Sequence, residues 1–185
     1  MEGVSEASDG ELVNRVLAGD TEAYAGLVAR YRDRLGRYAV RMLGNRADAE
    51  DALQETFVRA FRSLGRCTEP DRFGAWTFGI LVNRCRTLGA QRARRARLQV
   101  ADEIAVSRAA EPDDPVNRQV LREVIDAALR RLAPALREAF LLKFVEELSY
   151  EEMATMTGAS IPALKMRVSR GRAELRRLLD GADDA

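Results

Sequence analysis

The sequence predicts an all-α protein made of two small helical domains, joined by a flexible acidic linker, with a helix-turn-helix in the second domain. Apolar residues recur every three or four positions through most of the 185-residue chain, and no alternating strand pattern interrupts them. Aromatic residues are only 6% of the chain, which suits helices packed through Ala, Leu and Val. Residues 98–115 lack the helical period and contain several acidic residues and two prolines, so they are predicted to be the linker.

The first domain is predicted over residues 10–97, behind a mobile tail at residues 1–9. Apolar stripes predict four helices in it, near residues 12–17, 21–43, 46–64 and 71–97. Gly44 is expected to end the second helix, and Asn45 can cap the third. Residues 65–71 contain Gly and Pro and are predicted to form a loop.

The second domain is predicted over residues 116–180, beginning with an amphipathic helix. Pro134 stands where a new helix can start, because its missing N–H costs little in a first turn. The stretch Ser149–Glu152 has the spacing of a capping box and predicts the start of a short helix that ends at Gly158. Ser160 can cap the last helix of the chain.

Composition excludes several classes of function. The chain has no histidine, which removes the usual general base and the commonest metal ligand. Two cysteines, Cys67 and Cys85, are too few for a Cys₄ zinc site; we expect reduced thiols, and a redox switch is the alternative. No Gly-Lys phosphate loop, membrane-length apolar run or secretory signal is present. We therefore expect a cytoplasmic protein without membrane insertion that is not an enzyme and has no catalytic residue, metal or cofactor.

The last two helices have the spacing of a DNA-binding helix-turn-helix. A small residue at Ala154, a glycine at Gly158 and an apolar residue at Leu164 fit a tight turn between two packed helices. Leu164 and Val168 belong to a buried stripe that leaves a basic surface outside, and such a helix can enter the major groove. The alternative is an ordinary helical hairpin with solvated arginines.

Six arginines, without an acidic residue, lie between positions 84 and 97: Arg84, Arg86, Arg92, Arg94, Arg95 and Arg97. Phe73, Trp76 and Phe78 precede them on the same predicted helix. Arginines near aromatic rings are typical of proteins that bind single-stranded nucleic acid. The alternative is that the aromatic residues are core and the arginines form a solvated helix end.

A third feature is an acidic strip on the helix after Asn45. Its members are Asp48, Glu50, Asp51, Gln54 and Glu55. Asp48, Asp51 and Glu55 share one helical face, and Glu50 and Gln54 form an adjacent strip. Without a visible base partner these carboxylates do not indicate an acid/base enzyme. They indicate a surface that docks a partner, and the alternative is a solvated face that compensates the helix dipole.

These features, in this order, resemble the parts of a bacterial sigma factor. DAEDALQETFVRAF at residues 48–61 is similar to the polymerase-binding helix of that family, and FGAW at residues 73–76, continuing to Asn83, resembles its promoter-melting helix. LSYEEMA at residues 148–154, continuing to Arg172, resembles its C-terminal helix-turn-helix. The resemblance is to the small two-domain subgroup called extracytoplasmic-function sigma factors.

The resemblance implies a protein that binds core RNA polymerase, directs it to specific promoters and assists promoter melting. The implied contacts with the polymerase clamp helices are Asp48, Glu50, Asp51, Gln54 and Glu55. The implied −10 promoter contacts are Arg72, Asn83, Arg84, Arg86 and Arg92. The implied −35 contacts are Ser160, Ala163, Lys165, Met166, Arg167 and Arg170. The linker would follow the RNA exit path, and an anti-sigma factor is the implied regulatory partner.

A rival interpretation is a self-sufficient helix-turn-helix transcriptional regulator. Its first domain, residues 10–97, would then be a sensor or a dimerisation domain. Such a regulator would bind its duplex without polymerase, whereas a sigma factor would act through the polymerase.

Overall fold

The structure is a computed structural model that describes residues 7–98 and 116–180, with side chains over residues 7–94 and 123–180. Every regular element in these ranges is a helix, which confirms the predicted all-α class. The first unit contains α1 (Asp9–Leu17), α2 (Ala23–Leu43), α3 (Arg46–Arg62), the 3₁₀ turns η1 (Leu64–Arg66) and η2 (Pro70–Arg72), and α4 (Phe73–Leu98). The second contains α5 (Val116–Arg131), α6 (Pro134–Phe144), α7 (Tyr150–Thr157) and α8 (Ile161–Asp180). Residues 1–6 of the predicted tail and 99–115 of the predicted linker lie outside the described residues.

Local capping explains where the helices begin and end. Gly44 ends α2 with φ 76°, and the Asn45 side chain accepts a hydrogen bond from the Asp48 N–H at 2.8 Å to start α3. Ser149 and Glu152 form the predicted capping box of α7. Gly158 ends that helix with φ 69°, a conformation that a Cβ disfavours.

The chain is ordered further toward its start than the sequence suggests. Ser8 and Asp9 fall in the stretch predicted to be a mobile tail, yet Ser8 caps α1 and Asp9 is its first residue. Ser8 and Glu11 form a capping box, so the N–H groups of these two residues are satisfied locally.

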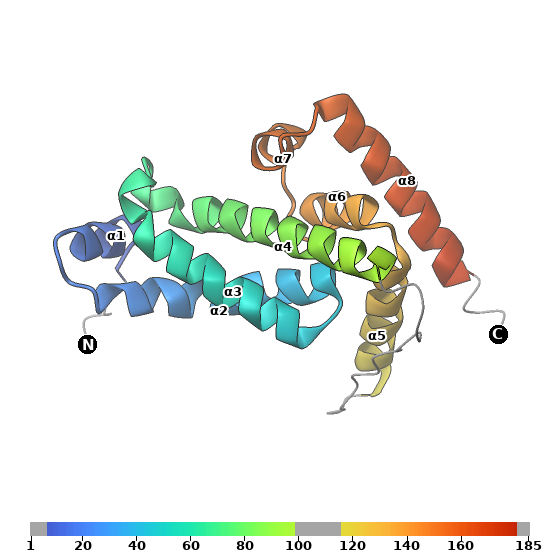
Figure 1. Ribbon diagram of the computed structural model, residues 1–185, viewed down its shortest axis with the longest axis horizontal. Helices are drawn as coiled ribbons and strands as arrows, with labels where there is room; N and C mark the ends of the chain where they lie inside the picture. The colour runs from blue at the N-terminus through green and yellow to red at the C-terminus, as the bar shows by residue number, and fades with distance from the viewer. Residues whose placement is uncertain (1–6, 99–115, 181–185) are drawn as a thin grey trace.

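In the first unit, α4 runs alongside α2 and α3, and α1 crosses the end where α4 begins (Figure 1). A small core joins α1 to this end. It contains Leu12, Val13, Val16, Leu27, Leu64 and Phe73. The start of α4 is thus held by apolar contacts with α1 and α2.

The two units share one larger core. Buried side chains from α2 and α4, among them Leu35, Leu81 and Val82, belong to the same apolar cluster as Leu142 and Met153 of the second unit. In Figure 1, α6 and α7 accordingly lie beside α4, and α5 crosses the end of α2. The two predicted helical units are both present, and their buried side chains pack into one core.

Arg137 of α6 fastens the second unit to the first. This buried arginine donates to the Met42 carbonyl of α2 at 2.7 Å, and to Leu129 and Leu132 carbonyls near the end of α5 at 2.8 and 3.2 Å. Burial lowers the pKa of its guanidinium. Because orphan carbonyls at a helix C-terminus attract a cation, one guanidinium satisfies the ends of two helices at once.

Candidate functional site

The last helix presents the surface that the sequence predicts. Leu164 and Val168 are buried, and Ile161 is half-buried. On the other side Ser160, Lys165, Met166 and Arg170 are exposed, and Ala163 and Arg167 are half-buried. The Ser160 hydroxyl accepts the Ala163 N–H at 3.4 Å, close to the limit for a hydrogen bond.

Basic side chains extend this surface across the helix pair. A groove of about 460 Å³ next to α8 is lined by Lys143, Tyr150, Lys165, Arg172 and Arg176, among others. The ammonium groups of Lys143 and Lys165 lie over the Tyr150 ring, 5.1 and 5.6 Å from its centroid. Such a groove places positive charge where a phosphate backbone could run.

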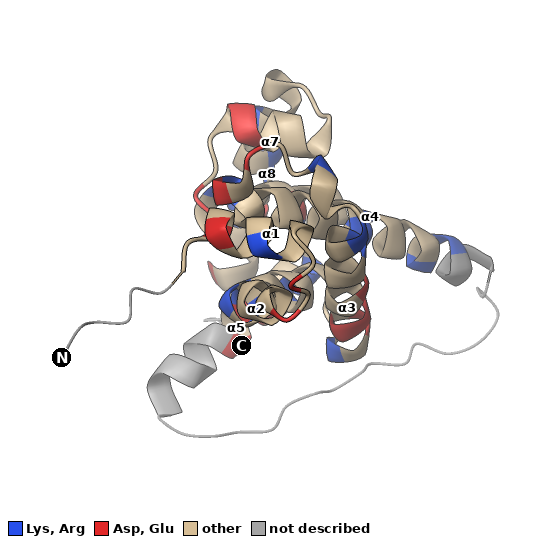
Figure 2. Ribbon diagram, turned by 90° about the vertical axis from the view of Figure 1, so that its left-hand side faces the viewer, with Lys and Arg blue, Asp and Glu red and all other residues tan. Residues whose placement is uncertain are grey.

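The acidic strip on α3 divides into an inward and an outward part. Asp48 and Glu55 are half-buried and turned toward α4, where they pair with Arg92 at 2.9 Å and Arg84 at 2.5 Å. The remaining members of the strip are exposed: Glu50, Asp51 and Gln54. Figure 2 shows acidic residues, in red, along α3.

The outward part is the portion of the strip that can meet a partner. Glu50 pairs with Arg46 one turn earlier at 2.9 Å, an exposed contact of little energetic value. Within the described part of the chain, the side chains of Asp51 and Gln54 take part in no hydrogen bond or ion pair. Asp51 is therefore the carboxylate most available to another molecule.

The five residues predicted to bind −10 DNA do not form one exposed surface. Arg72 and Asn83 are exposed, and Arg72 makes only a long contact of 3.3 Å with Glu69. Arg84 and Arg92 are occupied by the α3 carboxylates, and Arg92 also donates to the Leu43 carbonyl at 3.1 Å. Residues of the predicted −10 site and residues of the predicted polymerase-binding strip therefore form ion pairs with each other.

The Arg86 guanidinium forms hydrogen bonds with residues of the second unit. Its Nε and Nη2 atoms donate to the two carboxylate oxygens of Glu138 at 2.6 and 2.7 Å, and its Nη1 donates to the Thr157 carbonyl at 2.7 Å. Glu138 is buried on α6, and Thr157 ends α7. The hydrogen bonds that Arg86 donates to Glu138 raise the pKa of its guanidinium. Sequence reasoning missed this bridge because no local pattern links positions 52 residues apart.

Two further cross-unit ion pairs were also missed. Arg34 donates to the buried carboxylate of Glu146 at 2.9 Å, and Arg41 reaches Asp126 at 3.4 Å. Each joins α2 to the second unit, so α2 and α4 both contribute polar contacts to the interface.

The aromatic residues near the start of α4 are mostly core. Phe73 and Phe78 are buried, and Trp76 is half-buried with its ring centroid 6.0 Å from that of Phe73. The interpretation of Phe73 as a core residue is confirmed. Trp76 keeps part of its ring accessible at the surface.

Both cysteines are free and buried. Burial raises the pKa of the Cys67 thiol, and it raises that of Cys85 to about 12. Because the thiolate is the reactive form, Cys85 is protonated and unreactive at neutral pH. Reduced, inert thiols are the interpretation that fits this burial.

In residues 7–98 and 116–180, no group of His, Cys, Asp or Glu side chains could hold a metal ion. Across the same residues, no helix combines the length and the apolar character needed to cross a bilayer.

Comparisons with known proteins identify the family of both units. Residues 27–97 match the family model described as Sigma-70 region 2, and residues 122–175 match Sigma-70 region 4. The chain is 35% identical to the RNA polymerase sigma factor CarQ of Myxococcus xanthus over 90% of this chain and 95% of CarQ. The chain belongs to the extracytoplasmic-function family of RNA polymerase sigma factors.

Other relatives support this assignment. The chain is 37% identical to the sigma factor BldN of Streptomyces coelicolor over 95% of its own length, and it spans 66% of BldN. Among solved structures, the sigma factor RpoE bound to the anti-sigma factor NepR, from Bartonella quintana, matches with a TM-score of 0.69 and 26% identity over 85% of this chain and 96% of RpoE. CnrH, in complex with the cytosolic domain of CnrY, matches with a TM-score of 0.63 and 30% identity over 95% of this chain and 99% of CnrH.

The family assignment decides between the two interpretations of the first unit. A region 2 match over residues 27–97 makes it a sigma-factor domain and not a sensor or dimerisation domain. As a member of this family the chain directs RNA polymerase in transcription initiation.

Proposed function

We propose that three surfaces of this sigma factor have separate roles in transcription initiation. The exposed part of α3 docks core RNA polymerase, the loop and helix around η2 and α4 bind −10 DNA, and α8 reads −35 DNA. The observation that carries the proposal is that the surfaces lie on different helices: an acidic one on α3 and a basic one on α8, both of which contribute buried side chains to the shared core.

Polymerase docking rests on the outward carboxylates of α3. Glu50, Asp51 and Gln54 are exposed on adjacent turns, so they can meet a basic surface together. Asp48 and Glu55 support them indirectly, because their ion pairs with α4 fix the position of the helix.

Binding of −10 DNA uses the exposed Arg72 and Asn83 first. Arg84 and Arg92 add positive charge to this surface, and their ion pairs with α3 carboxylates hold them in position. Arg86 becomes available only when Glu138 and α7 move away from α4. The packed arrangement of the two units is therefore a state from which the chain must open before it melts DNA.

We further propose that the chain acts in the cytoplasm, catalyses no reaction and is held inactive by an anti-sigma factor. The sigma factor RpoE, which has a similar structure, is known in complex with the anti-sigma factor NepR, and the similar CnrH is known in complex with the cytosolic domain of CnrY. A partner that stabilised the packed arrangement would keep Arg86 occupied.

In-vitro transcription tests the promoter function directly. Core RNA polymerase is combined with the chain and fragmented genomic DNA, and transcript 5′ ends are sequenced. The expected result is a set of new starts with shared sequence near positions −10 and −35. Starts identical to those of core polymerase alone would refute the proposal, and tight specific binding of duplex DNA by the chain without polymerase would favour the self-sufficient regulator.

Variants of α8 test the −35 surface. Arg167→Ala and Arg170→Ala are compared on a panel of −35 duplexes at several salt concentrations. Loss of a base contact should cost about 1–3 kcal/mol and relax specificity at one position. Loss of a phosphate contact should weaken all sequences alike and reduce the salt slope by about one. Arg177→Ala is the control, because Arg177 already pairs with Glu174 at the far end of α8.

A further inference from the structure

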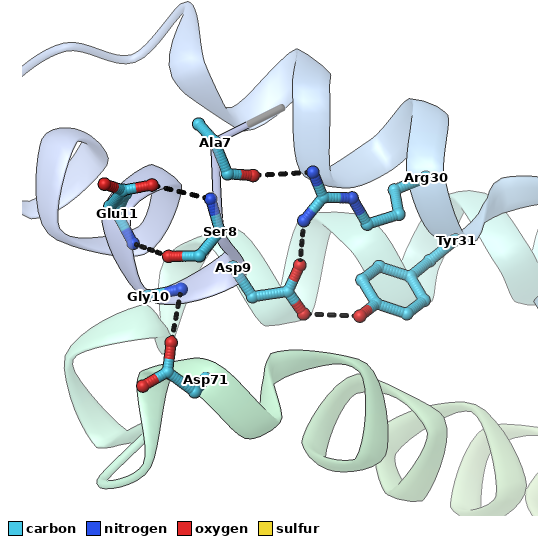
Figure 3. A network of polar contacts seen from close by, with 8 residues as sticks. All are labelled: Ala7, Ser8, Asp9, Gly10, Glu11, Arg30, Tyr31 and Asp71. Atoms are coloured by element: carbon cyan, nitrogen blue, oxygen red, sulfur yellow. Dashed lines mark hydrogen bonds and ion pairs between the residues drawn. The ribbon is translucent and has the colours of Figure 1, made fainter. Parts of the chain in front are cut away.

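The first helix makes polar contacts with two elements that are distant in the sequence (Figure 3). The buried carboxylate of Asp9 accepts hydrogen bonds from Arg30 and from the Tyr31 hydroxyl, both on α2. Arg30 also donates to the Ala7 carbonyl at 2.7 Å. These contacts fix the N-terminal end of α1 against α2.

The same end of α1 also holds η2. The Gly10 N–H donates to the Asp71 carboxylate at 3.1 Å, as the close-up shows. Gly10 lies in the first turn of α1, where backbone N–H groups have no partner within the helix. The Asp71 carboxylate supplies that partner, and its negative charge is favoured at the positive end of a helix.

Two glycines allow this close approach. A Cβ on Gly10 would lie 2.3 Å from the Asp71 Oδ1 atom, and a Cβ on Gly74 would lie 2.4 Å from the Tyr31 ring. Neither distance is possible for a real side chain. The Gly10–Asp71 hydrogen bond and the packing of the Tyr31 ring on the first turn of α4 therefore depend on the absence of side chains at residues 10 and 74.

The segment that α1 holds has little regular structure of its own. Between α3 and α4 the chain forms only two three-residue 3₁₀ turns, η1 and η2, and short 3₁₀ turns are weakly stable alone. Its exposed residues include Arg72, next to Asp71. External contacts such as that with Gly10 must therefore set the direction in which Arg72 points.

We propose that α1 is a support that positions the −10 binding loop, residues 65–72, and that Asp71 is the positioning residue that links the two. The proposal rests on the proposed function of this loop in −10 recognition. Asp71 acts through the Gly10 N–H to hold the loop, and Asp9 holds α1 in turn through Arg30 and Tyr31. These contacts of α1 contribute to discrimination between −10 sequences and not to affinity for the polymerase.

The experiment compares Asp71→Ala with Asp71→Asn and Gly10→Ala in the full chain bound to core RNA polymerase. The probe is a pool of single-stranded non-template oligonucleotides, randomised at the −10 positions, from which bound sequences are recovered and counted. Affinity for core polymerase and thermal unfolding of the free chain are measured in parallel. Asp71→Asn keeps an oxygen acceptor for the Gly10 N–H, so it is the conservative rescue.

Two control variants match these changes. Asp20→Asn removes an exposed ion pair with Arg15 at the other end of α1, away from η2, and keeps an oxygen that can accept the Ala23 N–H. Gly89→Ala adds a Cβ to α4 where no atom lies within 4 Å. Both should behave as the parent in every measurement.

Asp71→Ala and Gly10→Ala should reduce the preference for the selected −10 sequence by about fivefold, as expected for one lost hydrogen bond. Polymerase affinity should remain within about twofold of the parent, and Asp71→Asn should keep most of the preference. Parent-like preference in Asp71→Ala would overturn the proposal and leave the −10 assignment standing. A parent holoenzyme without any sequence preference in the pool would refute the −10 assignment and this inference with it.

Discussion

Arg86 and Glu138 form a two-point ion pair that joins the two units of this sigma factor, with N–O distances of 2.6 and 2.7 Å. Glu138 is only 3% exposed, so its charge depends on this one guanidinium for compensation. The same arginine is a predicted −10 DNA contact. If that prediction holds, the same side chain cannot contact the promoter while it is bound to Glu138.

Removing the arginine alone should destabilise the packed arrangement strongly. Arg86→Leu leaves the Glu138 carboxylate buried without a partner, and we expect a loss of about 3–5 kcal/mol in the free energy of unfolding. Urea denaturation at pH 7 measures it. The control is the double variant Arg86→Leu/Glu138→Leu, which should recover much of the loss because no buried charge remains. Equal stability of the single and double variants would show that the pair is not a buried bridge in solution.

Replacing Arg137 even by lysine should destabilise the fold. Its guanidinium reaches the Met42, Leu129 and Leu132 carbonyls at once, whereas an ammonium cannot match that fork. We expect Arg137→Lys to lose at least about 2 kcal/mol and Arg137→Leu more, since buried carbonyls are left without donors. Thermal unfolding measures both variants. Arg130→Lys, at an exposed position of α5, is the control and should be neutral. A neutral Arg137→Lys would contradict the assignment.

Charge reversal on α3 should separate docking from folding. Asp51→Arg changes an exposed carboxylate, so stability should shift by no more than about 0.5 kcal/mol while polymerase binding weakens, mainly through the association rate. Asp48→Arg instead opposes Arg92 and should destabilise the first unit. Stopped-flow binding at two salt concentrations and urea denaturation distinguish the two effects. Unchanged polymerase association in Asp51→Arg would remove α3 from the docking surface.

Alkaline pH should destabilise the fold through the buried thiols. The pKa of Cys85 is raised from 9 to about 12, so between pH 9 and 12 the unfolded state loses this proton while the folded state keeps it. Stability should then fall with rising pH, by about 1.4 kcal/mol per unit for one such group. The pKa of Cys67 shifts in the same direction. Urea titrations between pH 8 and 9 measure the slope below the ordinary tyrosine pKa of 10, because the pKa values of Tyr24, Tyr31 and Tyr38 are also raised in the folded state.

The cysteine-free variant Cys67→Ala/Cys85→Ala provides the reference for that experiment. Its overall stability should be lower than that of the parent because buried volume is lost, but its slope between pH 8 and 9 should be much shallower. A slope equal to that of the parent would mean that other groups carry the alkaline effect.

Local sequence signals determined the helices and the helix-turn-helix. The capping residues Asn45 and Ser149 and the left-handed glycines Gly44 and Gly158 act within a few residues of themselves, so their effects can be predicted without a fold. The capping box of Ser8 and Glu11 is a signal of the same kind, and it could have corrected the extent of the tail.

Tertiary structure alone decided which charged groups are free. The periodicity of α3 groups Asp48 and Glu55 with Asp51, but packing turns the first two toward α4 and leaves the third in solvent. Likewise, the pairs Arg86–Glu138 and Gly10–Asp71 join positions 52 and 61 residues apart. Helical periodicity specifies the face on which a residue lies; which partner meets that face depends on how the helices pack, and no spacing along the chain encodes it.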